Sequence, residues 1–344
     1  MPRTGTVIRI GLALAGAALV VHENARQAER RNPPMGDFVD AGGVRLHYIR
    51  RGKGEPTIVF LHGNGSIVEE IAASGLIDLA AEQHRVVAFD RPGFGHSERP
   101  RGRTWTPEDQ ASLLLEAFAK LGIDQPIVVG HSWGTLVALA MALNHPERVS
   151  GLVLMSGYYY PTARTDVAIF APPAIPILGD VMRYTISPLL GSILMPKLIR
   201  KMFRPASVPQ RFKAAVPTPM ILRPGQIRAS AQETALMISS AAALQSRYGE
   251  LRLPLTIIAG GGDRIVDPWR QAHRLHRQVA HSKILILQDE GHMVHHGAAR
   301  LVVAAIEAMA KELHRDGGEA ESAAEPADEV KATKEVMQPD SLGG

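Results

Sequence analysis

Short apolar runs alternate with longer amphipathic segments through most of this 344-residue chain. The short runs are rich in β-branched side chains, as buried strands are. Strands are expected at residues 57–61, 85–89, 127–129, 149–155, 255–259 and 284–287. Helices are expected at residues 67–81, 107–121, 133–144, 268–279 and 298–314. This alternation predicts an α/β fold with a mostly parallel sheet covered by helices on both faces.

Local signals refine this pattern. Residues 38–51 alternate apolar and polar side chains around Gly42-Gly43, which predicts a β-hairpin ahead of the parallel strands. Thr106 is a plausible N-cap for the helix that starts at Pro107, and Gly122 is a C-terminal stop.

The rhythm breaks between residues 157 and 249, which hold eleven of the 24 prolines. A long insertion between two strands of a sheet is usually a lid or binding element. The predicted organisation is therefore a first core part (35–156), a lid (157–249) and a second core part (250–314).

The insertion carries weaker hints about its role. Its bulky side chains either line an apolar pocket or pack the lid onto the sheet domain. These side chains are Tyr158, Tyr159, Tyr160, Phe170, Met182, Met195, Phe203 and Met237. Residues 193–204 combine apolar and basic side chains, a pattern that suits either an anionic membrane surface or a solvated lid helix.

The N-terminal part, residues 1–34, needs separate treatment. Arg3 and Arg9 precede an uncharged apolar run at residues 10–21, and a charged connector follows at residues 22–34. Twelve helical residues span roughly 18 Å, less than the roughly 30 Å hydrocarbon core of a bilayer. The segment resembles a signal peptide or weak membrane anchor, which predicts a cell-envelope location; an ordinary N-terminal helix in a cytoplasmic protein is the alternative.

Composition narrows the chemistry. The chain has no cysteine, which excludes disulfides and thiolate catalysis. Residues 315–344 hold eight acidic and three basic residues and almost no large apolar ones, so this tail is expected to be disordered. The net charge of +4 therefore becomes about +9 without the tail, which suits either anionic surfaces and substrates or an ordinary basic surface.

The strongest chemical signal is Gly130-His131-Ser132-Trp133-Gly134, which fits G-x-S-x-G. A predicted strand ends at Gly130 and a predicted helix follows Ser132, which is the context of a nucleophile elbow. We therefore expect Ser132 to be a nucleophile, with its hydroxyl presented at the carboxyl edge of the sheet.

A serine nucleophile needs a base, and the base needs a carboxylate that orients it. His292 follows the last predicted strand, and Asp263 follows the glycine-rich end of the preceding one, which gives the chain order Ser, Asp, His. Asp267 competes with Asp263 but better suits a helix N-cap. His295 and His296 are interpreted as surface histidines, because no carboxylate partner at metal-ligand spacing is evident, and no metal is expected.

An oxyanion hole should come from two backbone N–H groups. One belongs to Trp133, the residue after the nucleophile, and the other is expected from Asn64 in Leu61-His62-Gly63-Asn64-Gly65.

Together these motifs resemble the serine-nucleophile branch of the α/β-hydrolase superfamily with a lid, over residues 37–311. The segment 90–97 is usually a structural turn in that family, so Asp90 receives no catalytic role. His62-Gly63-Asn64 with a tryptophan after the nucleophile is similar to haloalkane dehalogenases. Those enzymes use an aspartate, whereas Ser132 would form a stable ether, so dehalogenation is disfavoured.

We therefore expect a cofactor-free hydrolase that cleaves a carboxylic ester with apolar character through an acyl-enzyme. Its partner would be a small acyl substrate, with possible membrane contact and no nucleic acid. The open alternatives are a carbon–carbon bond hydrolase, an acyltransferase, a cofactor-free peroxidase, or a non-catalytic binding module on the same scaffold.

Overall fold

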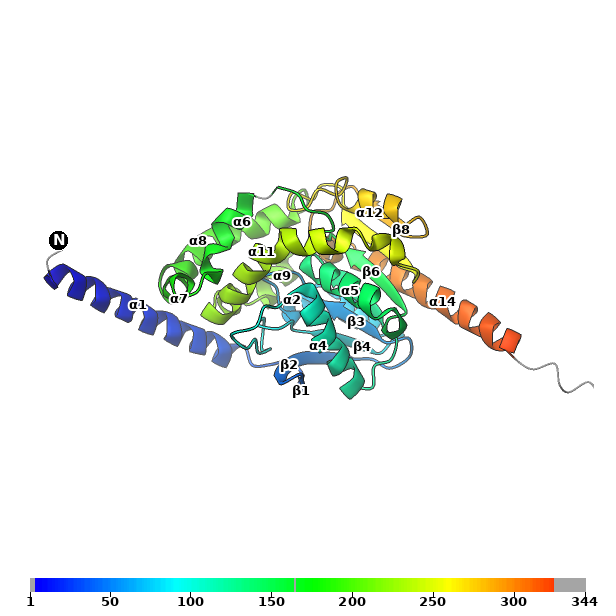
Figure 1. The fold of residues 1–344 in the computed structure, drawn as a ribbon, viewed down its shortest axis with the longest axis horizontal. Helices are drawn as coiled ribbons and strands as arrows, with labels where there is room; N and C mark the ends of the chain where they lie inside the picture. The colour runs from blue at the N-terminus through cyan, green and yellow to red at the C-terminus, as the bar shows by residue number, and fades with distance from the viewer. Residues whose placement is uncertain (1–3, 164, 325–344) are drawn as a thin grey trace, which may run out of the picture.

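An eight-stranded sheet forms the centre of the computed structural model, which describes residues 4–163 and 165–324 (Figure 1). Its strand order is β1-β2-β4-β3-β5-β6-β7-β8. The strands are β1 (Asp37–Ala41), β2 (Val44–Arg51), β3 (Ile58–Leu61), β4 (Val86–Phe89), β5 (Ile127–His131), β6 (Gly151–Met155), β7 (Leu255–Gly260) and β8 (Lys283–Leu287). The first two form the predicted hairpin, β2 pairs antiparallel with β4, and β3 to β8 run parallel to one another.

Helices cover both faces of the sheet, as predicted. Apolar side chains of α4 (Pro107–Lys120) and α5 (Trp133–Asn144) pack on one face. Those of α2 (Val68–Ser74), α3 (Leu76–Ala80) and α14 (Ala299–Ala324) pack on the other. In the second core part, α12 (Ala272–Gln278) packs on β7 and β8. The short helix α13 (Val294–Gly297) lies next to α14.

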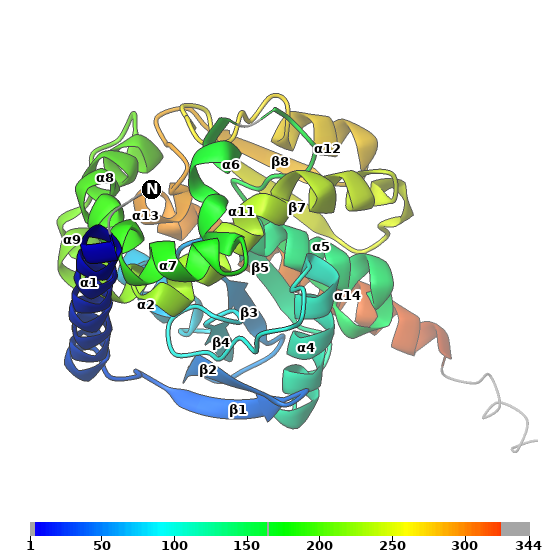
Figure 2. The same ribbon diagram turned by 60° about the vertical axis from the view of Figure 1, so that its left-hand side comes forward.

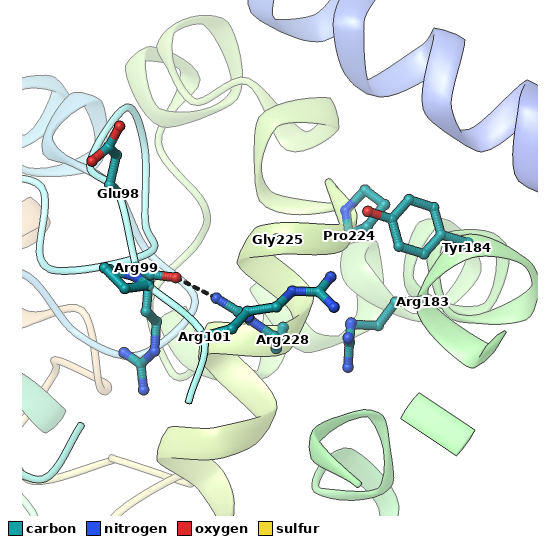
Figure 3. Close-up of a pocket in the computed structure, with 9 residues that line it drawn as sticks. Glu98, Arg99, Arg101, Arg183, Tyr184, Pro224, Gly225 and Arg228 are labelled. Atoms are coloured by element: carbon teal, nitrogen blue, oxygen red, sulfur yellow. Dashed lines mark hydrogen bonds between the residues drawn. The ribbon is translucent and has the colours of Figure 1, made fainter. Parts of the chain in front are cut away.

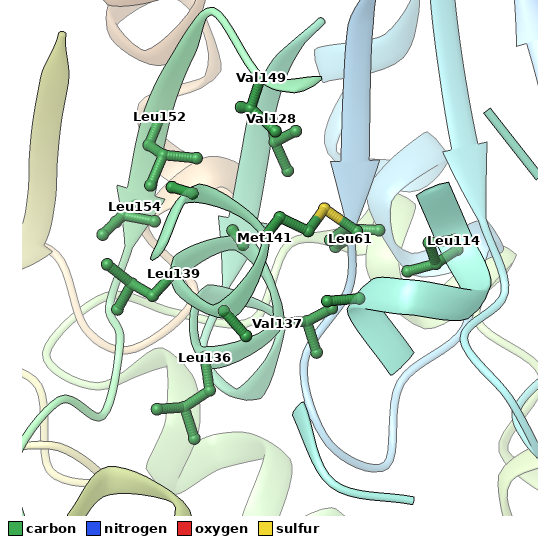
Figure 4. Packing of buried hydrophobic residues seen from close by; sticks show 14 of the residues in the cluster. Leu61, Leu114, Val128, Leu136, Val137, Leu139, Met141, Val149, Leu152 and Leu154 are labelled. Carbon is green, nitrogen blue, oxygen red and sulfur yellow. The ribbon is translucent and has the colours of Figure 1, made fainter. Parts of the chain in front are cut away.

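The helix that follows Ser132 lies deep in the core. All of its residues except Asn144 are buried. Figure 4 shows Leu139 and Met141 of α5 among side chains of the neighbouring strands, including Val128 and Leu154. A helix that is apolar on all sides is stable only when it is enclosed, and this enclosure fixes the position of its N-terminus.

The sequence between β6 and β7 folds into a group of helices. They are α6 (Thr165–Phe170), α7 (Leu178–Tyr184), α8 (Ile186–Phe203), α9 (Gln210–Ala215), α10 (Thr218–Ile221) and α11 (Pro224–Gln245). Short 3₁₀ turns are present at Pro146–Arg148, Pro172–Ala174 and Tyr248–Glu250. Tyr158, Tyr159, Tyr160 and Met237 belong to the main core cluster, so these side chains pack rather than line an open pocket.

Three expectations from the sequence need correction. The predicted connector at residues 22–34 is largely helical, because α1 runs without a break from Thr4 to Arg31 (Figure 2). The expected helix at 67–81 is split by Gly75, whose φ of 83° ends α2. Helix α14 continues to Ala324 rather than ending before a disordered tail at residue 315, since alanine and glutamate favour helix there. The rest of the predicted tail, residues 325–344, lies outside the described residues.

Within the described ranges, no helix is both long enough and apolar enough to span a membrane.

Candidate active site

Ser132 stands at a sharp turn between β5 and α5. Its φ of 51° and ψ of −117° are unusual for a residue with a side chain, and its N–H donates to Met155 O at 2.9 Å. The two glycines of the motif make this turn possible. A Cβ on Gly130 would lie 2.8 Å from Gly134 O, and one on Gly134 would lie 2.4 Å from Leu61 O. The turn leaves Ser132 partly exposed among buried neighbours.

His292 and Asp263 form a hydrogen-bonded pair on two neighbouring loops. His292 Nδ1 lies 2.7 Å from Asp263 Oδ2, and both side chains are almost fully buried. The other carboxylate oxygen, Oδ1, accepts hydrogen bonds from Ile265 N and Val266 N at 2.7 and 3.0 Å. The carboxylate is therefore fixed in orientation, as a residue that orients an imidazole has to be.

Asp267, the competing carboxylate, is placed differently. Its side chain is 51% exposed, and its Oδ1 accepts from Trp269 N and Arg270 N at 2.9 and 3.1 Å. The residue caps the turn before α12, which is the capping role expected from the sequence. The geometry thus pairs His292 with Asp263 rather than with Asp267.

Residues of the insertion between β6 and β7 contact the loop that carries His292. His292 N–H donates to Met202 O, at the end of α8, over 2.8 Å. Gly291 lies so close that a Cβ there would be 2.3 Å from Arg204 O, and a Cβ on Gly262 would be 2.2 Å from the Pro205 ring. Residues 202–205 therefore pack directly on both loops that carry the His–Asp pair.

The glycine-rich loop after β3 approaches the nucleophile closely. A Cβ on Gly63 would lie 3.1 Å from the Ser132 Cβ. The side chain of Asn64 donates to Ser230 O and Thr234 Oγ1 of α11 at 3.2 and 3.0 Å, which anchors the loop to the insertion.

Asn64 and Trp133, the two residues expected to form an oxyanion hole, both carry polar atoms without partners. Among the described residues, neither backbone N–H has a hydrogen-bond acceptor. Asn64 Oδ1 and Trp133 Nε1 are buried and also unpartnered. Buried polar atoms are normally satisfied, so this cluster beside Ser132 is suited to receiving a polar group of a substrate.

The two histidines that follow His292 are buried, so their interpretation as surface residues is wrong. Nε2 of His295 and Nε2 of His296 each lie 2.6 Å from Oε1 of Glu70 in α2. Burial raises the pKa of Glu70, but the two histidines outweigh burial and hold this pKa well below its usual range. The carboxylate that the sequence did not reveal lies 225 residues earlier in the chain.

This cluster connects all three loops around Ser132. The ring of His131, which precedes Ser132, lies 5.0 Å from that of His292 and 4.6 Å from that of His295. Its Nε2 lies 3.0 Å from His292 O. Glu70 in turn accepts a hydrogen bond from Ser66 in the loop after β3, at 2.9 Å.

Glu70, His295 and His296 also place their ligand atoms within 4.8 Å of one another, as a metal site would. Metal-bound histidines normally donate their second ring N–H to an acceptor. Here the Nδ1 atoms of His295 and His296 are buried and have no partner in the part of the chain that the structure describes. We therefore interpret the cluster as a hydrogen-bond network, with both histidines donating to one carboxylate oxygen.

A buried ion pair contacts and stabilises the loop after β3. Arg91 donates to both carboxylate oxygens of Glu233 in α11, and its NH2 group also donates to Gly63 O at 3.0 Å. Both side chains are fully buried. The cation nearest to Gly63 is therefore neutralised by its own partner.

Asp90 has the structural role expected of it. It accepts hydrogen bonds from Val68 N and His96 N at 2.9 and 3.0 Å and lies 2.7 Å from His47 Nδ1.

The chain belongs to the alpha/beta hydrolase fold family, whose model matches residues 56–299. One relative is a 2-hydroxymuconate semialdehyde hydrolase of Pseudomonas sp. (strain CF600), 38% identical over 37% of this chain and 45% of its own length. A 2-hydroxy-6-oxo-2,4-heptadienoate hydrolase of Pseudomonas putida is 27% identical over 76% of this chain and 91% of its own length. A solved thermophilic esterase from Thermogutta terrifontis aligns with a TM-score of 0.66 at 22% identity, over 81% of this chain and 100% of its own.

Several of these matches are partial. The chain spans between 31% and 53% of the length of the first curated relatives it matches. Their shared part establishes the fold, and the reaction has to be argued from the site.

Proposed function

We propose that this protein is a serine hydrolase that cleaves carboxylic esters with an apolar acyl or alcohol group. Ser132 would attack the ester carbonyl, and His292 would take its proton and later return it to the leaving alcohol. Asp263 would orient His292, and the N–H groups of Trp133 and Asn64 would stabilise the oxyanion. The observation that carries the proposal is the 2.7 Å His292–Asp263 hydrogen bond on loops beside the strained turn at Ser132.

The carbonyl oxygen of the acyl group would accept hydrogen bonds from the N–H groups of Trp133 and Asn64, which have no acceptor among the described residues. The tetrahedral intermediate forms one new C–O bond to Ser132, and collapse releases the alcohol. Water then attacks the acyl-enzyme, with His292 again accepting and returning a proton. A helix N-terminus beneath the nucleophile adds a field that favours the developing negative charge.

A carbon–carbon bond hydrolase is the second candidate, because two of the relatives named above carry such names. A substrate of that class is a dienoate and carries a carboxylate, which needs a cation. Arg91 is the arginine nearest to Gly63, and Glu233 already neutralises it. This pairing favours an uncharged ester over an anionic dienoate.

A substrate panel tests the proposal. We expect p-nitrophenyl esters to be hydrolysed, with kcat/KM rising about fourfold per added methylene up to an optimum chain length. The dienoate 2-hydroxy-6-oxo-2,4-heptadienoate serves as the comparison. Turnover of the dienoate without turnover of any ester would replace ester hydrolysis by carbon–carbon cleavage.

We further propose that the protein docks on the surface of a lipid membrane, which would place it at the cell envelope. Large apolar side chains are exposed on α1, on α6 to α8 and between α6 and α7, at the same end of the molecule (Figure 1). We call this set the apolar face; it comprises Ile8, Leu12, Leu14, Leu19, Val20, Ile169, Phe170, Ile175, Ile177, Leu178, Val181, Ile186, Leu189, Leu190, Ile193 and Leu194.

Charge supports this docking, since exposed Lys197, Arg200 and Lys201 lie on α8 beside the apolar side chains. Cosedimentation of the full chain with phosphatidylcholine vesicles, with and without phosphatidylglycerol, tests it. We expect binding to both and tighter binding to the anionic vesicles. Recovery of all the protein in the supernatant with either vesicle would refute the docking.

A further inference from the structure

Two adjoining cavities lie between the loop at residues 98–101, α7, α11 and α1. Figure 3 shows the residues that line the first of them. The volumes of the two cavities are about 460 and 310 Å³. They share the lining residues Arg99, Tyr184, Pro224, Gly225 and Arg228. We call the two together the arginine cavity, and neither is lined by a residue of the Ser–His–Asp set.

The lining has an excess of positive charge. Six arginines contribute, against two carboxylates, Glu29 and Glu98. The arginines are Arg26, Arg99, Arg101, Arg183, Arg223 and Arg228. Figure 3 shows Arg183 of α7 and Arg228 of α11 facing the same space as the loop that carries Arg99 and Arg101.

Three of these cations have a carboxylate partner, whereas Arg26, Arg99 and Arg228 have none of their own among the described residues. Glu29 forms an ion pair with Arg223 at 2.6 Å, and Asp180 pairs with both Arg183 and Arg101. The carboxylate nearest to Arg99 is Glu233, at 4.0 Å. Glu233 already binds Arg91 through both oxygens, as described above.

Arg99 and Arg228 are also incompletely hydrogen-bonded. The side chain of Arg99 is 2% exposed, yet its Nη2 group has no acceptor among the described residues. Arg228 donates from NH2 to Arg99 O, but its Nε is buried without a partner. Buried donors that lack an acceptor are costly, so such groups usually mark a place where another acceptor belongs.

The electrostatics agree with this geometry. Burial lowers the pKa of Arg99 to about 10. Burial also lowers the pKa of Arg228, and repulsion from Arg101 and Arg183 lowers it further. An anion among these guanidinium groups would relieve both the burial cost and the mutual repulsion.

We propose that the arginine cavity binds a phosphate group, presented either by a soluble phosphate ester or by the headgroup of an anionic phospholipid. Phosphate offers several acceptor oxygens at once, which several planar guanidinium groups can share. The cavity borders α1 and α7, which carry part of the apolar face. A headgroup bound there would lie against Tyr184 at the end of α7, the helix that also carries the exposed side chains of Leu178 and Val181.

Two binding measurements on the full chain separate the sources of phosphate. Calorimetric titration with glycerol 3-phosphate reports the soluble ester, and cosedimentation with phosphatidylcholine vesicles containing phosphatidylglycerol reports the lipid. The variants are Arg228→Gln and, because its side chain is 67% exposed and tolerates change, Arg101→Gln. Arg200→Gln on α8 removes one exposed charge outside the cavity and is the matched control.

We expect both cavity variants to weaken binding about tenfold, and Arg200→Gln to leave glycerol 3-phosphate binding unchanged. A loss confined to glycerol 3-phosphate identifies a soluble ester as the ligand, and a loss on the anionic vesicles identifies the lipid. Equal affinities of the wild type, Arg101→Gln and Arg228→Gln for both probes would overturn the proposal, as would no binding of either probe to the wild type. Neither readout involves ester cleavage, and the calorimetric titration involves no vesicle either, so its result stands or falls separately from both the proposed ester hydrolysis and the proposed membrane docking.

Discussion

The carboxyl edge of the sheet and the apolar face differ in how they satisfy their side chains. At the sheet edge, Asp263 and Glu70 are buried and every carboxylate oxygen has a protein partner. On the apolar face, Ile177 and Leu189 are 82% and 61% exposed and have no such cover. The sheet edge holds its side chains in a fixed geometry, whereas the apolar face presents side chains that can contact a surface outside the molecule.

The largest effect is expected at the carboxyl edge of the sheet. Asp263→Asn should lower kcat by up to about 10⁴-fold, because the amide favours the wrong tautomer of His292. Asp267→Asn is the matched control, with the same chemical change four residues away. It should leave kcat nearly unchanged and cost little stability, because an asparagine oxygen caps a helix about as well as an aspartate oxygen. Steady-state kinetics with a p-nitrophenyl ester measure both, and a larger kinetic loss in Asp267→Asn would reverse the assignment.

The sheet edge was largely predictable from the sequence, because its residues are close to recognisable local signals. Ser132 lies in a five-residue motif, and Asp263 and His292 each follow a strand of a parallel sheet, whose carboxyl ends share one edge. Glu70 was not predictable in this way. Its partners His295 and His296 are far along the chain, and nothing near Glu70 in the sequence distinguishes it from a surface carboxylate.

The apolar face and the arginine cavity also depend on the tertiary structure. The apolar run at residues 10–21 was visible, but its position next to α7 was not. Arg99 and Arg228 come together only because α11 packs on the loop after β4. Side chains that are 129 residues apart leave no periodic signal in either segment.

A smaller effect is expected at the hydrogen-bond network. Glu70→Gln should lower kcat by up to about 100-fold, because the loops of Ser132 and His292 lose their common anchor and shift. Glu69→Gln is the neighbouring control. Burial raises the pKa of Glu69 to about 7, and Glu69 is not part of the network of Glu70, His295 and His296, so Glu69→Gln should leave kcat nearly unchanged.

If Glu70, His295 and His296 form a hydrogen-bond network, activity should not depend on a metal ion. Activity of the wild type should be unaffected by EDTA, and elemental analysis should find less than one zinc per chain. Loss of activity in EDTA that added zinc restores would show that Glu70, His295 and His296 form a metal site instead of a hydrogen-bond network.

On the apolar face we expect about a tenfold effect. Ile177→Asp should weaken binding to phosphatidylcholine vesicles by about tenfold or more, because burying one such side chain contributes about 1.5–3 kcal/mol. Leu301→Asp on α14, which is 50% exposed at a site outside the apolar face, is the control and should bind as the wild type does. Equal weakening by both substitutions would mean that the contact is not confined to the apolar face.

The smallest effect concerns pH and stability. Burial lowers the pKa values of His62, His131 and His296, so the unfolded chain binds protons near pH 6.5 that the folded chain does not. Stability from these groups is present above about pH 6.5 and is lost as the pH falls below it, by at most about 1.4 kcal/mol per pH unit and histidine. Glu69, with its raised pKa, acts in the opposite direction between about pH 4.5 and 7.

Burial also lowers the pKa of His96 and raises that of Glu290, so four histidines oppose two glutamates, and Tm should fall by several degrees between pH 7 and pH 5. Thermal unfolding at a series of pH values measures it. A Tm that is constant or rises over this range would contradict the buried, neutral state of these histidines.

The central claim is that Ser132 forms the covalent acyl-enzyme, and active-site labelling tests it most directly. The full-length protein and its Ser132→Ala variant would be treated with a fluorophosphonate, digested and analysed by mass spectrometry. We predict one adduct, on the peptide containing Ser132, with loss of esterase activity in proportion to labelling, and no adduct on the variant. An adduct on another residue with Ser132 unmodified, or full esterase activity in Ser132→Ala, would contradict the claim.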